Sequence, residues 1–113
     1  MAFVLNVAFD CAEPRALAGF WSAATGYRPV VERDDFVRLR APDERSVRHL
    51  LFVRVPESKA VKNRMHLDLA HRTPEDEIAR LVGLGATRGE SHSGNGTRWT
   101  VMFDPEGNEF CLG

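Results

Sequence analysis

The residues best suited to chemistry are His66, in the stretch Met65-His66-Leu67-Asp68-Leu69-Ala70, and Cys111 near the end of the chain, to which Asp10 or Asp68 would add a carboxylate if its side chain points inward. Imidazole and thiolate both suit zinc. A thiol activated by a neighbouring imidazole is also a nucleophile. The commoner roles are a histidine that lines a cleft through hydrogen bonds and a cysteine that packs as a small hydrophobe. Metal ligands, a nucleophile with its base, and plain cleft-lining residues all stay open for this set.

A repeat of the same pattern places Asn6 at the position equivalent to His66, 60 residues earlier (66 − 6). Pro14 and Pro74 are related in the same way, and a helix-like run that ends at a glycine follows each of them. A repeat of this kind indicates two copies of one structural unit. We therefore expect Asn6 and His66 to occupy equivalent points, where two half-modules would face one cavity.

Alternating and helical hydrophobic periodicities predict the order strand, helix, strand, strand, strand in each half. The first half is expected to have strands over 3–11, 28–32, 36–40 and 48–55, with a helix over 14–26. The second half is expected to have strands over 65–70, 86–91, 97–103 and 108–112, with a helix over 74–85. Thr73 has the residue type of a helix cap, and Asn95-Gly96 is typical of a type I′ hairpin.

The first strand of each half has an apolar face and a polar face. Val7, Phe9 and Cys11 are expected to pack on the helix, whereas Asn6 and Asp10 point the other way. In the second half His66 and Asp68 take the polar face. These faces predict an α+β fold in which two βαβββ modules in tandem form a curled mixed and antiparallel sheet around a cleft.

Four segments give the chain its resemblance to the vicinal oxygen chelate superfamily, which includes glyoxalases, bleomycin resistance proteins and extradiol dioxygenases. They are Asn6-Val7-Ala8-Phe9-Asp10, the Phe20-Trp21 to Gly26 helix end, Lys62-Asn63-Arg64-Met65-His66-Leu67-Asp68-Leu69, and Asp104-Pro105-Glu106-Gly107-Asn108-Glu109-Phe110-Cys111. They extend over essentially the whole chain and resemble a glyoxalase-like subfamily common in bacteria. The resemblance implies a homodimer and a small-molecule ligand.

In the metal-dependent members of this superfamily each module supplies about half of the ligands. Carried over by position, the ligand sites fall on Asn6, near Val53, on His66 and on Cys111, where a Glu would be expected. An amide oxygen is a poor substitute for a carboxylate, and valine has no donor atom. A catalytic zinc site usually has three good protein ligands, so the sequence departs from the metal pattern.

We therefore expect a single domain over 1–113, built from repeats over about 1–57 and 62–113, that binds a small molecule without a metal. The expected ligand-binding residues are Asn6, Asp10, Val53, His66, Asp68, Trp99 and Cys111. The alternative is a lyase, isomerase or dioxygenase that holds zinc, nickel, manganese or iron through His66, Cys111 and Asn6. A third hypothesis is a dimer-building domain without a ligand.

Composition excludes several other classes. The chain has 113 residues and a formal net charge of −1, which argues against nucleic acid as a partner. No apolar run reaches the length of a membrane span, and the first residues lack a signal-peptide pattern. Two cysteines do not make a disulfide framework. A cytoplasmic location is the expectation.

Overall fold

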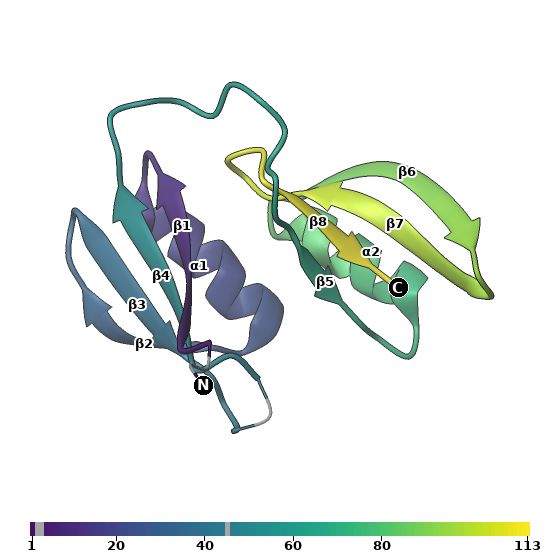
Figure 1. The fold of residues 1–113 in the computed structure, drawn as a ribbon, viewed down its shortest axis with the longest axis horizontal. Helices are drawn as coiled ribbons and strands as arrows, with labels where there is room; N and C mark the ends of the chain where they lie inside the picture. The colour runs from purple at the N-terminus through teal and green to yellow at the C-terminus, as the bar shows by residue number, and fades with distance from the viewer. Residues whose placement is uncertain (2–3, 45) are drawn as a thin grey trace. The chain divides into compact units, whose positions relative to one another are not determined.

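The computed structural model describes residue 1 and residues 4–44 and 46–113, and within them it has two compact units, Met1–Lys59 and Ala60–Gly113. We call these the first and the second module. Each contains one helix and one four-stranded sheet (Figure 1). The predicted tandem of βαβββ modules is confirmed. No helix in the described ranges is long and apolar enough to span a membrane.

The first module begins with a strand and a helix and continues with three more strands. They are β1 (Asn6–Cys11), α1 (Pro14–Thr25), β2 (Arg28–Glu32), β3 (Phe36–Arg40) and β4 (His49–Arg54). The strand order is β1-β4-β3-β2, with β1 parallel to β4 and the other pairs antiparallel. The sheet is therefore mixed, as predicted. Residue 3, the expected start of β1, lies outside the described residues.

Helix α1 covers one face of this sheet and leaves the other face without a helix (Figure 1). Trp21 of α1 is 1% exposed, and its ring lies 5.4 Å from the ring of Phe9. Phe9 in turn stacks on Phe52 of β4 at 5.0 Å. The apolar side of β1 thus packs on the helix, as its alternation predicted. The opposite side, which we call the open face of the module, carries Asn6 and Asp10.

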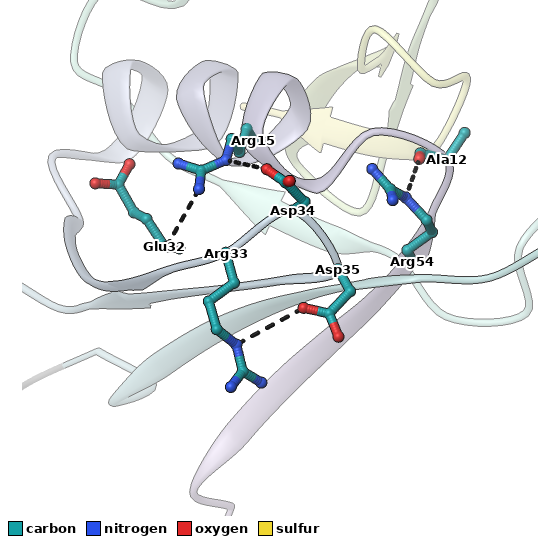
Figure 2. A network of polar contacts seen from close by, with 7 residues as sticks. All are labelled: Ala12, Arg15, Glu32, Arg33, Asp34, Asp35 and Arg54. Atoms are coloured by element: carbon teal, nitrogen blue, oxygen red, sulfur yellow. Dashed lines mark hydrogen bonds and ion pairs between the residues drawn. The ribbon is translucent and has the colours of Figure 1, made fainter.

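Three arginines make polar contacts in the β2–β3 turn and at the end of β4 (Figure 2). Their partners are Asp34 for Arg15, Asp35 for Arg33, and the carbonyl oxygen of Ala12 for Arg54. These contacts join the ends of strands rather than their faces. The guanidinium group of Arg33 also lies over the ring of Phe36, 5.8 Å from the ring centroid.

The second module repeats this order with different lengths. Its elements are β5 (Leu67–Leu69), α2 (Pro74–Gly83), β6 (Thr87–Gly94), β7 (Thr97–Phe103) and β8 (Glu109–Leu112), in the sheet order β5-β8-β7-β6. The core of the second module is made of buried side chains from the helix and the sheet. They are Ile78 and Leu81 from α2 and Met102, Phe110 and Leu112 from the sheet.

Turn residues explain where the elements of the second module end. Asn95 and Gly96 have φ of 52° and 76°, the two positive values of the predicted type I′ hairpin. Because the ladder continues to the turn, β6 extends to Gly94 rather than ending at residue 91. Thr73 occupies the N-cap position just before α2, but contrary to expectation its side chain makes no capping hydrogen bond. Its hydroxyl lies 3.2 Å from Nδ1 of His71 instead.

Candidate functional site

The second module brings three of the expected site residues together. Asp68 of β5 and Cys111 of β8 are directly paired, so their side chains lie on the same face of the sheet. His66 comes immediately before β5, and its Nε2 lies 3.2 Å from Oδ1 of Asp68. The nitrogen, oxygen and sulfur donor atoms all lie within 4.8 Å of one another. We call these three residues the His66–Asp68–Cys111 group.

Burial and the neighbouring carboxylate both disfavour ionisation of the Cys111 thiol. Removal from water raises the pKa of Cys111, the negative charge of Asp68 raises it further, and Lys62 lowers it in part. A thiol with a raised pKa is a weaker nucleophile at neutral pH, because less of it is thiolate. This geometry disfavours the nucleophilic hypothesis for Cys111.

The turn before β8 fixes the position of Cys111. Asp104 is 3% exposed, and its carboxylate accepts hydrogen bonds from the backbone nitrogens of Glu106 and Asn108 and from the side-chain amide of Asn108. The backbone nitrogen of Asn63 also donates to Oε2 of Glu109, at 2.9 Å. These bonds hold the segment before His66 against the start of β8.

Apolar side chains surround the polar group on the same face. Val101 of β7 is directly paired with Cys111, and Trp99 lies two residues before it on the same side. Trp99 is half-buried, and its ring stacks against that of His92 at 5.8 Å. The open face of the second module therefore combines a few polar groups with an apolar surface, the composition of small-molecule sites.

The remaining expected residues belong to the first module. Asn6 and Asp10 lie on the open face of β1, and Val53 is the direct partner of Asp10 on β4. The Oδ1 atom of Asn6 lies 3.0 Å from Nδ1 of His49. No pattern in the sequence singled out His49, because its contact with Asn6 depends on strand pairing.

The strand register corrects one equivalence drawn from the sequence. Asp68 is paired with Cys111 in the second module, and Ala8, 60 residues before Asp68, is paired with Leu51 in the first. The first-module counterpart of Cys111 is therefore Leu51, two residues before Val53. Leucine also lacks a donor atom, so the first module still offers no late-strand ligand.

The donor set of the His66–Asp68–Cys111 group fits a divalent transition metal. Zinc bonds of about 2.0 Å to nitrogen and about 2.3 Å to sulfur place tetrahedral ligands roughly 3.5 Å apart. The side chains of His66 and Asp68 are 44% and 77% exposed and free to make that small adjustment. Three protein ligands would leave an open position, where a bound metal supplies a Lewis acid for a substrate oxygen.

Comparisons with known proteins agree with this architecture. A family model described as a glyoxalase-like domain matches residues 6–113. A glyoxalase/bleomycin resistance protein/dioxygenase family enzyme from Burkholderia phytofirmans has a similar structure, with a TM-score of 0.80 and 16% identity over 98% of this chain and 97% of that one. A search of curated proteins found no match.

Two further solved structures are similar. A possible glyoxalase from Bacillus cereus gives a TM-score of 0.75 at 16% identity, over 99% of this chain and 98% of that one. A mutant of the fosfomycin resistance protein FosX from Listeria monocytogenes, complexed with Mn(II) and 1S,2S-dihydroxypropylphosphonic acid, gives 0.80 at 8% identity, over 99% and 89%. At these identities the likeness concerns the fold alone.

Proposed function

This chain belongs to the glyoxalase-like domain family of the vicinal oxygen chelate superfamily, and on that premise we propose that it binds a small molecule at the His66–Asp68–Cys111 group without a metal. The observation that supports this proposal is the contact of His66 with Asp68, whose Nε2 and Oδ1 atoms lie 3.2 Å apart. The raised pKa of Cys111 also disfavours the thiolate form that binds metals. A metal would have to displace the thiol proton and replace the contact between His66 and Asp68.

The surface around the group supports the same proposal. Val101 and Trp99 are half-buried on the same face, so a ligand that covers them removes apolar area from water. Asp68 and His66, both exposed, would fix the orientation of the ligand through hydrogen bonds. The proposed site needs no contribution from Cys11, which is buried on the other side of its own sheet, as expected.

A thermal-shift screen of metal-free protein against a broad metabolite library tests the proposal. We expect hits whose dissociation constants, measured by titration calorimetry, increase about tenfold in Asp68→Ala, the loss of one charged hydrogen bond. Asp76→Ala, which removes an exposed carboxylate from α2, is the matched control. A screen without hits would favour the dimer-building domain, and hits that bind Asp68→Ala normally would place the site elsewhere.

A second candidate is a metal-dependent lyase, isomerase or dioxygenase, and the proximity of its three donor atoms favours it. Elemental analysis after purification without chelators, and after soaking with zinc, nickel, manganese and iron, tests this candidate. Stoichiometric metal that is lost in His66→Ala and retained in His71→Ala would support it and overturn the metal-free proposal. No bound metal under any of these conditions would overturn this candidate.

The family resemblance adds a homodimer and a cytoplasmic location to the proposal. Light scattering after size-exclusion chromatography measures the first. A mass of twice 12.7 kDa across a dilution series is the expected result, and a monomer at all concentrations would contradict it.

A further inference from the structure

The open face of the first module carries three arginines on two neighbouring strands. Arg28 of β2 is directly paired with Arg40 of β3, so their side chains share one face. Arg38 lies two residues before Arg40 on the same side. Val37 and Leu39 alternate with these arginines along β3, and each is 1% exposed on the side that packs against α1. The three guanidinium groups therefore extend from the face that no helix covers.

These three arginines differ from others in the same module. Arg15, Arg33 and Arg54 each contact an acidic side chain or a carbonyl oxygen (Figure 2). Among the residues that the structure describes, the guanidinium groups of the open-face set make no ion pair and no side-chain hydrogen bond. Their residues are Arg28, Arg38 and Arg40. The guanidinium group of Arg38 lies over the ring of Phe36, 5.5 Å from the ring centroid.

Repulsion between these arginine side chains destabilises the sheet when no anion is bound. Like charges directly opposite each other on paired strands destabilise a sheet, and Arg28 and Arg40 are such a pair. His49 of β4 is directly paired with Arg40, and its pKa is affected by the same positive charges. Its pKa is lowered by burial and then by Arg38, Arg40 and Arg48. A neutral His49 donates its Nδ1 hydrogen to Oδ1 of Asn6 and keeps Nε2 as an acceptor.

The acidic residues of this module lie elsewhere on the sheet or in loops. Asp10 is on the open face, but it is paired with Val53, four residues along β4 from His49. Asp43 and Glu44 belong to the loop after β3, where they line a hollow with Arg40. Asp10 and Glu44 form no ion pair with the three arginines within the described residues.

We propose that Arg38 and Arg40, with Arg28 beside them, bind an oxyanion, a carboxylate or phosphate group, on the open face of the first module. The Cα atoms of Arg38 and Arg40 are about 7 Å apart along one strand, so two long side chains reach one anion. Guanidinium forks match the oxygen geometry of both groups. This inference goes beyond the proposed function, because the anion site lies wholly within the first module.

Titration of the metal-free full-length protein with inorganic phosphate, and separately with acetate, followed by amide NMR at constant ionic strength, tests the site. We expect saturable shifts at residues 28, 38–40 and 49. The dissociation constant should rise about tenfold in Arg38→Gln/Arg40→Gln, through loss of charge-assisted hydrogen bonds. The pKa of His49 should rise on saturation, because the anion offsets the arginine charges. Phosphate and acetate distinguish the two oxyanion classes.

Arg64→Gln/Arg72→Gln removes the same charge from the second module and is the matched control, expected to bind phosphate as the wild type does. Equal weakening in both double variants, or shifts that do not saturate, would overturn the inference. Library hits that depend on Asp68, without saturable phosphate binding, would overturn this inference and leave the proposed function standing. A blank library screen with saturable phosphate binding that depends on Arg38 and Arg40 would overturn the proposed function and leave this inference standing.

Discussion

Oδ1 of Asn6 lies 3.0 Å from Nδ1 of His49, so the residue that the repeat relates to His66 already has a partner in its own module. His66 has one too, because its Nε2 lies 3.2 Å from Asp68. The equivalent positions of the two modules therefore both form intramodular polar pairs. A metal that used Asn6 would have to compete with His49 for the amide oxygen.

Replacing Arg40 with glutamine should raise the pKa of His49 toward its ordinary value. Burial is the main cause of the lowered pKa, and the charges of Arg38, Arg40 and Arg48 add to it. Removing one of these charges makes the imidazolium less unfavourable. Imidazole NMR shifts followed against pH measure the effect. Arg54→Gln removes a charge whose guanidinium contacts the carbonyl oxygen of Ala12, and an equal change there would mean that net charge alone acts.

Replacing Asp68 with asparagine should make Cys111 more reactive at neutral pH. Burial and then Asp68 raise the pKa of Cys111, so removing the carboxylate lowers it and increases the thiolate fraction. The rate of alkylation by iodoacetamide should then rise at lower pH than in the wild type. Cys11 is 3% exposed and should stay unmodified in folded protein. Asp76→Asn is the control, and an unchanged pH profile in Asp68→Asn would contradict the expectation.

The elements could be predicted because their signals are local. Alternation in β1, with Phe9 on the helix side, follows from a period of two, and the Asn95-Gly96 turn follows from two residues that tolerate positive φ. Thr73 shows the limit of such rules. It has the right type and position, yet the nearby His71 takes its hydroxyl, so residue type alone did not fix the hydrogen bond.

The candidate site depends on register, which a single sequence leaves open. His49 contacts Asn6 across 43 positions through the parallel pairing of β1 and β4. The same register identifies Leu51, not Val53, as the counterpart of Cys111. The repeat did single out His66, and Asp68 lies two residues after it, so their proximity is local. Which role Asn6, Asp10 and Trp99 play in binding stays a prediction.

Truncation of Leu81 to alanine should destabilise the second module strongly. Leu81 belongs to α2, and its side chain is fully buried. Truncation of a buried leucine costs about 2–5 kcal/mol of unfolding free energy, because apolar transfer energy is lost and a cavity remains. Urea unfolding followed by circular dichroism measures the change. Val82→Ala is the control in the same helix, because Val82 is 45% exposed. Its change should stay within about 0.5 kcal/mol, and similar losses at both sites would mean that α2 packs differently.

The ion pair of Glu77 with Arg80 should make stability depend on acid pH. Arg80 donates from Nε and Nη2 to the two carboxylate oxygens, at 2.7 and 2.8 Å. These bonds hold the pKa of Glu77 below its ordinary value of 4.5. The contribution is therefore complete above pH 4.5 and is lost as pH falls through the folded-state pKa.

Glu77→Gln should consequently lower the melting temperature at neutral pH and have a smaller effect at acid pH, as Glu77 becomes protonated in the wild type below its folded-state pKa. Differential scanning calorimetry across this range measures the difference. Asp76→Asn is the control on the same helix turn. A melting temperature difference that is the same at both pH values would exclude the ion pair as its cause.

Replacing Asp104 with alanine should lower the unfolding free energy by about 3 kcal/mol, because it leaves three partly buried donors of Glu106 and Asn108 without their charged acceptor. Asp104→Asn keeps the shape and one acceptor oxygen, so a smaller loss is expected. Urea unfolding measures both. Because the turn also fixes the start of β8, Asp104→Ala should shift the amide NMR signals of Glu109 and Cys111 even where the protein stays folded. A change within about 0.5 kcal/mol, with those signals unmoved, would show that the turn forms without this carboxylate.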